Sequence, residues 1–206
     1  MTARFITVEG IEGAGKSTCI GFIQSYLANS GKQVVVTREP GGTALGEQIR
    51  HLLLDRKQTA MSIDTELLLM FAARAEHIAQ VIRPALAAGQ WVLSDRFTDA
   101  SYAYQGGGRC VPAERIAVLE DWVQAELRPD LTLLLDIPVA MGLERAGRRS
   151  TPDRFESEQQ AFFERVRAAY LQQARTHARR YRVIDAAQAL AQVEAQIQSA
   201  LDEFLT

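Results

Sequence analysis

The amino-acid sequence predicts an α/β protein with a five-stranded parallel sheet and helices on both of its faces. Two observations indicate this class. Short apolar or β-branched runs recur along the chain, and helical patterns separate them. No Asn-Gly or Asp-Gly pair joins two of these runs as a hairpin turn would. Strands that alternate with helices are expected to be parallel and to be joined by right-handed crossovers.

The strands are nearly continuous in apolar residues, which fits a sheet that is buried on both faces. They are expected at 4–9, 33–37, 90–95, 131–137 and 181–185. The helices are expected near 15–29, 44–55, 64–88, 112–127, 138–146, 157–178 and 188–205. Pro84 falls inside the third of these helices and should kink or interrupt it.

The chain is expected to form one domain, 1–206. Its 206 residues are 47% hydrophobic, which is enough for a substantial core. There is no repeat and no Pro/Ser-rich linker. The polar segment 146–157, which contains Pro152, is the exception, and we expect it to be a mobile lid rather than packed structure.

Composition argues against several classes of partner and ligand. The net charge of −2 gives no general attraction to nucleic acid or to an anionic membrane. The two cysteines and three histidines follow no metal-ligand spacing. The chain has no signal-peptide pattern and no apolar run long enough to cross a bilayer, so a cytoplasmic location is expected.

The stretch GIEGAGKS has the spacing of a phosphate-binding loop, and it lies between a predicted strand and a predicted helix. Glycines allow tight turns in which backbone N–H groups face phosphates. Lys16 can reach the β- and γ-phosphates of ATP, and the Ser17 hydroxyl can bind Mg²⁺. The residues expected to bind the nucleotide here are Gly10, Ile11, Glu12, Gly13, Ala14, Gly15, Lys16, Ser17 and Thr18.

Glu12 is unusual in such a loop, because a carboxylate would repel the phosphates. We expect its side chain to point across the site, toward a sugar hydroxyl of a second substrate. The alternative is an exposed loop acid with no role.

The strand QWVLSD ends in Asp95, at the sheet edge where open α/β proteins bind ligands. Asp95 can orient the water shell of Mg²⁺, and the adjacent Arg96 can hold a second phosphate. Asp136, at the end of LTLLLD, competes for the metal role. The arginine beside Asp95 favours that residue.

Phosphate loops serve several classes of protein. A GTPase is disfavoured, since the only asparagine, Asn29, is not part of an Asn-Lys-x-Asp element. Arginines 145, 148, 149 and 154 crowd the lid, where they could neutralise charge during phosphoryl transfer. These features favour a small-molecule kinase. Another nucleotide or deoxynucleoside kinase and an ATP-binding switch are the alternatives.

The chain resembles the bacterial thymidylate kinases along essentially its whole length. The likeness is carried by FITVEGIEGAGKST, TREPGGT, AARAEH, SDRF followed by YAYQGGGR, and PDRFE, in this order and spacing. The resemblance implies a phosphate-loop kinase fold and transfer of the γ-phosphoryl group of ATP to dTMP with Mg²⁺. It also implies a homodimer.

The resemblance further implies roles for individual residues. Glu12 would approach the acceptor's 3′-hydroxyl, Arg96 its phosphate and Arg74 its thymine. Tyr104 would lie under the deoxyribose and exclude a 2′-hydroxyl. The remaining residues implied around the acceptor are Arg38, Glu39, Pro40, Arg50, Ser101 and Gln105.

Three implied contacts lie in other parts of the site. Relatives commonly place a stacking phenylalanine where this chain has Met70, so either Met70 or Phe71 would cover the base. Arg149 and Arg154 resemble lid arginines that act on the transferred phosphate, although Arg148 could replace Arg149. Asp185 and Ala186 would border the adenine.

Overall fold

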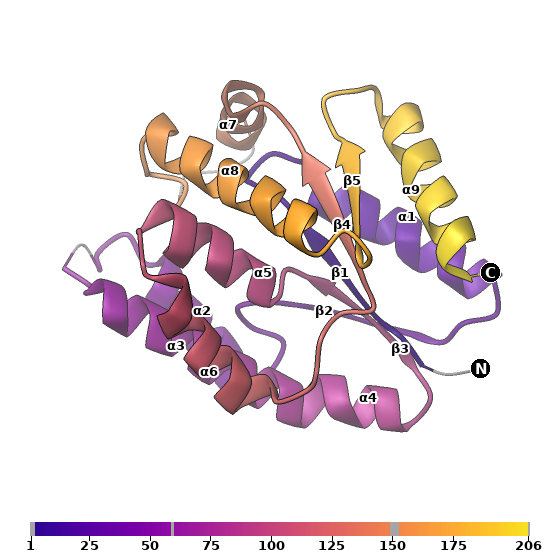
Figure 1. Cartoon of the computed structure of the whole chain (residues 1–206), viewed down its shortest axis with the longest axis horizontal. Helices are drawn as coiled ribbons and strands as arrows, with labels where there is room; N and C mark the ends of the chain where they lie inside the picture. The colour runs from indigo at the N-terminus through magenta and orange to yellow at the C-terminus, as the bar shows by residue number, and fades with distance from the viewer. Residues whose placement is uncertain (1–2, 59, 149–152, 206) are drawn as a thin grey trace.

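The computed structural model describes residues 3–58, 60–148 and 153–205. In this part of the chain, five parallel strands form one sheet in the order β2-β3-β1-β4-β5 (Figure 1). The strands are β1 (Phe5–Glu9), β2 (Val34–Arg38), β3 (Trp91–Asp95), β4 (Leu131–Asp136) and β5 (Tyr181–Asp185). The predicted fold class is confirmed, and each strand lies within a residue or so of its expected position.

Strand β1 lies at the centre of the sheet, between β3 and β4. All five of its residues are buried, so both faces of the sheet are covered. Ile6 and Val8 join the main core, whereas Phe5 packs with Ile82 and Phe97 in a second cluster. The alternation follows from the two-residue period of a strand. Because the strands are parallel, their carboxyl ends meet at one edge, where the phosphate loop begins.

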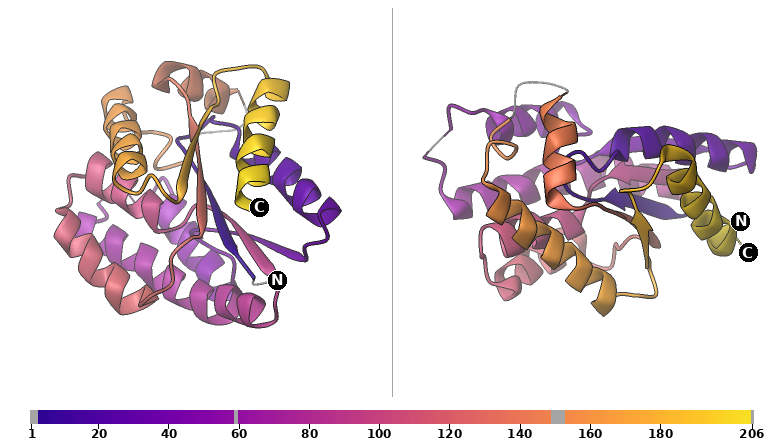
Figure 2. Two further views of the ribbon diagram at one scale, coloured as in Figure 1. Left: turned by 45° about the vertical axis from the view of Figure 1, so that its right-hand side comes forward. Right: turned by 90° about the horizontal axis from the view of Figure 1, so that it is seen from above.

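Helices cover both faces of the sheet (Figures 1 and 2). Helices α1 (Lys16–Asn29) and α9 (Leu190–Leu205) pack side by side on one face. Helices α4 (Arg83–Ala87), α5 (Thr98–Ser101) and α8 (Gln160–Thr176) lie on the other. Helix α3 (Ile63–His77) packs against both α2 (Ala44–Leu54) and α6 (Ala113–Gln124), and α7 (Val139–Gly147) contacts α8. None of the described helices is long and apolar enough to cross a bilayer.

The third predicted helix is interrupted, as Pro84 indicated. Helix α3 ends at His77, a π-helical turn η1 (Ile78–Ile82) follows, and α4 begins with Pro84 in its first turn. Proline is tolerated there because the first N–H groups of a helix have no intrahelical partner.

The sequence prediction was wrong to leave residues 98–108 outside a helix. They form α5 and a π-helical segment, η2 (Tyr102–Gly108), which packs against α8. Its three consecutive glycines do not favour a helix, but they allow close contact. A Cβ on Gly107 would lie 2.6 Å from the Cβ of Ala169 and 2.8 Å from the carbonyl oxygen of Arg165. Tertiary packing therefore overrides local propensity here.

The lid region is better packed than its polar sequence indicated. Phe155 is 5% exposed, and its ring meets that of Tyr104 edge-on at 5.9 Å. Residues 149–152, and with them the predicted lid arginine Arg149, lie outside the described residues. That the lid moves during the reaction stays a prediction.

Candidate active site

The phosphate loop joins the end of β1 to the start of α1, as the sequence predicted. Gly13 and Gly15 have φ angles of +74° and +91°, which L-residues with a side chain rarely adopt. A Cβ on Gly13 would also lie 1.9 Å from the carbonyl oxygen of Gly142 on α7. The loop is thus tight enough for its backbone N–H groups to line a small anion.

Helix α1 begins without a side-chain cap, since Gly15 precedes it and its first turn contains no acid. By contrast, Thr43 caps α2 and Ser62 caps α3, each through a side-chain oxygen. The first N–H groups of α1 are therefore available to an anion, which the helix dipole also favours. The side chains of Ser17 and Thr18 in this turn are exposed.

The ammonium group of Lys16 lies against the loop. Its Nζ donates to the carbonyl oxygens of Gly10 and Ile11, at 3.0 Å each. Burial, and then the neighbouring guanidinium of Arg96, lower the pKa of Lys16 to about 8. The positive charge is thus poorly solvated, and an incoming phosphate would stabilise it.

Glu12 forms a compact cluster with Arg96 and Tyr104. Arg96 Nη2 donates to Glu12 Oε1 at 2.7 Å and to the Tyr104 hydroxyl at 2.7 Å. The Tyr104 hydroxyl in turn donates to Glu12 Oε2 at 2.6 Å. Burial alone would raise the pKa of Glu12, but Arg96 and Lys16 outweigh it and hold that pKa below its ordinary value. Glu12 is therefore an ionised acid, 9% exposed, and the alternative of an exposed loop acid is wrong.

Arg96 occupies a strained backbone position directly after β3. Its φ angle is +69°, in the left-handed region that non-glycine residues avoid. Its Nε is buried and has no hydrogen-bond partner among the described residues. A strained residue with an unused buried donor is typical of a binding site.

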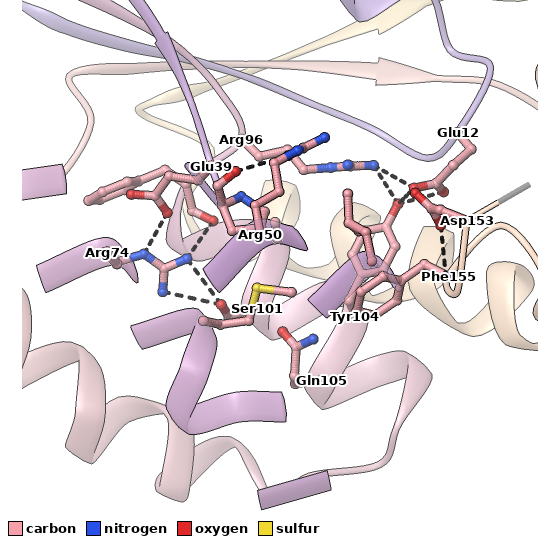
Figure 3. A pocket seen from close by; sticks show the side chains of 15 residues that line it. Glu12, Glu39, Arg50, Arg74, Arg96, Ser101, Tyr104, Gln105, Asp153 and Phe155 are labelled. Carbon is pink, nitrogen blue, oxygen red and sulfur yellow. Dashed lines mark hydrogen bonds and ion pairs between the residues drawn. The ribbon is translucent and has the colours of Figure 1, made fainter. Parts of the chain in front are cut away.

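A cavity extends from this cluster toward α3 and α5. Arg50 and Arg96 reach it on one side, and Arg74 and Ser101 on another (Figure 3). Glu39 and Ser101 hold the guanidinium of Arg74 in place (Figure 3). The residues that line the cavity are Glu12, Glu39, Pro40, Arg50, Leu54, Met70, Arg74, Arg96, Phe97, Ala100, Ser101, Tyr104, Gln105, Asp153 and Phe155. The structure thus brings together most of the residues that the sequence assigned to the acceptor.

Arg74 is almost fully engaged by its neighbours. Its Nε donates to Glu39 Oε2 at 2.8 Å, and its Nη2 donates to the carbonyl oxygen of Phe97 at 3.2 Å. Both terminal nitrogens approach Ser101 Oγ, at 3.1 and 3.2 Å. A guanidinium has five N–H groups, so these contacts leave one N–H on Nη1 for another acceptor.

Met70 and Phe71 lie in different environments. Met70 lines the cavity. Phe71 is buried in a separate cluster with Leu67, and its ring centroid lies 4.6 Å from the guanidinium carbon of Arg74. Of the two, Met70 is therefore in position to contact a ligand in the cavity, whereas the ring of Phe71 packs against the guanidinium of Arg74.

The two candidate metal-binding acids, Asp136 and Asp95, also lie in different environments. Asp136 forms a bidentate ion pair with Arg167, at 2.7 and 2.8 Å. Asp95 Oδ1 is buried and has no hydrogen-bond partner in the described part of the chain. A buried carboxylate oxygen without a partner is costly, and a bound cation or its water would satisfy it.

Several predicted residues lie away from the cavity. Arg38 pairs with Glu47, 2.8 Å away, and is half exposed. Asp185 is exposed at the end of β5, where its carboxylate accepts from its own loop, and Ala186 is buried beside it. Arg154 donates to Leu53 O at 2.7 Å and pairs with Glu66 at 2.7 Å.

Sequence reasoning missed some residues of the site. Glu9, a fully buried acid at the end of β1, lies beside the turn that carries Arg96. An ionisable residue at the carboxyl end of a buried strand was the available signal. The cavity residues that were missed are Leu54, Phe97, Ala100, Asp153 and Phe155. Phe97 lies in the SDRF motif, and Asp153 and Phe155 lie in PDRFE, so those two motifs were the available signal. Leu54 and Ala100 are apolar and lie in neither motif.

A family model described as thymidylate kinase matches residues 8–197 of this chain. The chain belongs to the thymidylate kinase family. It is 60% identical over 205 residues to the thymidylate kinase of Pseudomonas savastanoi pv. phaseolicola, covering 100% of this chain and 98% of that protein. It is 57% identical over 203 residues to the thymidylate kinase of Thiobacillus denitrificans, covering 98% of each chain.

The fold also matches a solved member of the family. The crystal structure of thymidylate kinase from Ehrlichia chaffeensis superimposes with a TM-score of 0.79 at 32% sequence identity, covering 98% of this chain and 99% of that one. The resemblance found in the sequence motifs is thus confirmed over the whole chain, and with it the phosphate-loop kinase fold.

Proposed function

We propose that this chain phosphorylates dTMP to dTDP in the cavity beside the phosphate loop, with ATP as the donor. Family membership supports the reaction. An oxygen of the dTMP phosphate attacks the γ-phosphorus of ATP, the bond from that phosphorus to the β-phosphate oxygen breaks, and ADP leaves. The observation that carries the assignment is the shared cluster of Glu12, Arg96 and Tyr104, which joins the donor loop to the acceptor cavity.

The loop and α1 are proposed to hold the donor phosphates. The uncapped N–H groups of α1 and the turns at Gly13 and Gly15 suit them. Lys16 would exchange its two carbonyl contacts for the β- and γ-phosphates, where charge grows as the bond breaks. Asp185 and Ala186, with Arg145 donating to the Ala186 carbonyl at 3.0 Å, remain our candidates for the adenine border.

The residues present also fit Mg²⁺. This ion keeps several waters and takes one or two carboxylates plus substrate phosphates rather than a closed protein cage. No group of three or more His, Cys, Asp or Glu side chains in the described chain could hold a metal alone, which agrees with that mode. We propose Asp95 and Ser17 as the residues that hold it, because Asp95 Oδ1 has no hydrogen-bond partner among the residues that the structure describes. When bound, the ion neutralises charge on the β- and γ-phosphates.

At the acceptor phosphate we propose Arg96 and Arg50. The Arg96 Nε has no partner in the described chain, and Arg50 Nη1 donates to Pro40 O at 2.9 Å while its guanidinium lines the cavity. Glu12 would accept from the 3′-hydroxyl of the deoxyribose. Tyr104, held by Glu12, would fill the space that a ribose 2′-hydroxyl needs.

At the base, the remaining N–H of Arg74 would donate to a thymine carbonyl. Arg74 has no acceptor atom, so an amino group at that position, as in cytosine, would face another donor. Met70 would cover the face of the ring and Gln105 its edge. Arg149 and Arg154 are retained as the proposed lid arginines, although Arg154 would first have to leave Glu66.

A homodimer is the assembly that we propose, with a cytoplasmic location. Large apolar side chains are exposed on α2, α3 and α6, which pack side by side. Trp122 on α6 is 80% exposed and Val118 is 67% exposed. A second copy of this face would cover such a surface. The other exposed residues on these helices are Leu45, Leu52, Ile63 and Leu68.

The test is ADP release that depends on dTMP, in the wild type and in Lys16→Ala. We expect the wild type to form ADP only when dTMP, ATP and Mg²⁺ are all present. Lys16→Ala should fold, and its rate should fall by a factor of about 10²–10³, the magnitude typical of one electrostatic contact to the transition state. Retention of more than about a tenth of the rate in this variant would refute the role of Lys16.

A further inference from the structure

Glu9 is a buried acid to which the proposed reaction assigns no role. It is the last residue of β1 and is 0% exposed. Its Oε1 accepts from the backbone N–H of Phe97 at 2.8 Å, and its Oε2 accepts from the Tyr170 hydroxyl at 2.8 Å. One carboxyl group thus connects β1, the turn after β3 and helix α8.

The turn that Glu9 holds is the one that sets the direction of Arg96. The φ angle of Arg96 is +69°, so the turn persists only if neighbouring contacts fix it. Arg96 N donates to Val8 O at 3.0 Å, and Arg96 O accepts from Ser94 Oγ at 2.7 Å. The bond from Phe97 N to Glu9 fixes the next peptide. Together these bonds clamp the backbone on both sides of the Arg96 side chain.

We propose that Glu9 is a positioning residue for Arg96. It holds the turn that directs the guanidinium toward the phosphate of dTMP, and Tyr170 holds Glu9 in its own orientation. Glu9 itself touches no substrate in this account, which rests on the proposed role of Arg96. Loss of Glu9 should therefore weaken recognition of the phosphate and spare recognition of the nucleoside.

Glu9 acts here through the two hydrogen bonds that it accepts, from Phe97 N and from the Tyr170 hydroxyl. Burial, and next the nearby carboxylate of Asp99, raise the pKa of Glu9 to about 8. Glutamine has nearly the same shape as glutamate and no charge, so Glu9→Gln tests the two hydrogen bonds by themselves. In Glu9→Gln the amide oxygen can accept from Phe97 N, and the amide nitrogen can donate to the Tyr170 hydroxyl.

The experiment measures the dissociation constants of dTMP and of thymidine by calorimetry on the full chain. Glu9→Leu should raise the dissociation constant of dTMP by about tenfold or more, the loss expected for a displaced charged contact. It should change the dissociation constant of thymidine by less than about twofold. Glu9→Gln should bind both ligands within about threefold of wild type, because it keeps both hydrogen bonds. Tyr170→Phe, which removes one of the two bonds, should weaken dTMP alone, by at least about twofold.

Equal losses for dTMP and thymidine in Glu9→Leu would mean a general structural role and would overturn the proposal. So would a loss in Glu9→Gln as large as that in Glu9→Leu. If Glu9→Leu does not fold by circular dichroism, Tyr170→Phe decides, and unchanged dTMP binding in that variant overturns the proposal.

The variant Arg96→Ala separates a failure of the proposed role of Arg96 from a failure of the proposed role of Glu9. If this variant binds dTMP and thymidine as the wild type does, the proposed role of Arg96 fails. If Arg96→Ala weakens the binding of dTMP but not of thymidine, and neither Glu9→Leu nor Tyr170→Phe does so, only the role of Glu9 fails.

Discussion

At the scale of single residues, the charged groups of the site either pair with a specific neighbour or keep one buried polar atom without a hydrogen-bond partner among the described residues. Glu12 is ionised and shared between Arg96 and Tyr104, so it can accept from a sugar hydroxyl without facing the donor phosphates. Arg96 and Asp95 are adjacent in sequence, and each has a buried polar atom with no partner among the described residues. An anion would suit the free donor of the arginine, and a cation would suit the free oxygen of the aspartate.

The metal assignment predicts a change in the Mg²⁺ requirement. Asp95→Asn should raise the Mg²⁺ concentration needed for half-maximal rate by about 10–100-fold, the usual cost of altering a group that orients a metal. Asp136→Asn is the matched control, because its carboxylate is occupied by Arg167. It should lower the melting temperature and leave the Mg²⁺ titration unchanged. Equal shifts in the titration for both variants would refute the choice of Asp95.

At the scale of the elements, the sequence was most informative where chemistry fixes local geometry. The glycine spacing of the loop and the acid that ends β3 could both be recognised, since each needs particular residue types at particular positions. Residues 98–108 could not be recognised as helical, because Gly107 and Gly108 are set by close packing on α8. Phe155 belongs to the PDRFE motif, but its position beside Tyr104, 51 residues earlier in the chain, is set by ring packing that the motif does not show.

The lid segment carries a prediction at this scale. Arg154 links the lid to Leu53 at the end of α2 and to Glu66 on α3. Arg154→Ala should lower the melting temperature, since it removes one partner of a buried ion pair. If Arg154 also serves the reacting phosphates, kcat should fall far more than the KM for dTMP rises. A lower melting temperature with unchanged kcat would show that Arg154 only anchors the lid.

At the scale of the whole molecule, the parallel sheet explains why residues far apart in the sequence form one site. Strands β1 and β3 are neighbours and end together, which brings Glu12 within reach of Arg96, 84 residues later. Sequence alone could suggest this edge, because ligands of open α/β sheets bind there. It could not predict that Met70 rather than Phe71 faces the cavity, since the two are neighbours on one helix and are both apolar.

The assembly is tested by a charge placed on the exposed apolar face. Trp122→Lys should convert the dimer to a monomer in analytical ultracentrifugation, because a desolvated ammonium is costly at an interface. Leu190→Lys is the matched control, since Leu190 is also exposed but begins α9, which packs with α1 and β5. It should leave the dimer intact. A wild-type chain that sediments as a monomer would contradict the proposal outright.

Selection of dTMP by this site is tested most directly by measuring kcat/KM for dTMP, dUMP, dCMP and UMP with the wild-type chain. We expect dTMP to be the best acceptor, followed by dUMP, which lacks only a methyl group worth about 1–3 kcal/mol in an apolar pocket. Both dCMP and UMP should be poor, because cytosine presents a donor to Arg74 and the 2′-hydroxyl of UMP meets Tyr104. A wild-type enzyme that uses dCMP as well as dTMP would contradict the account.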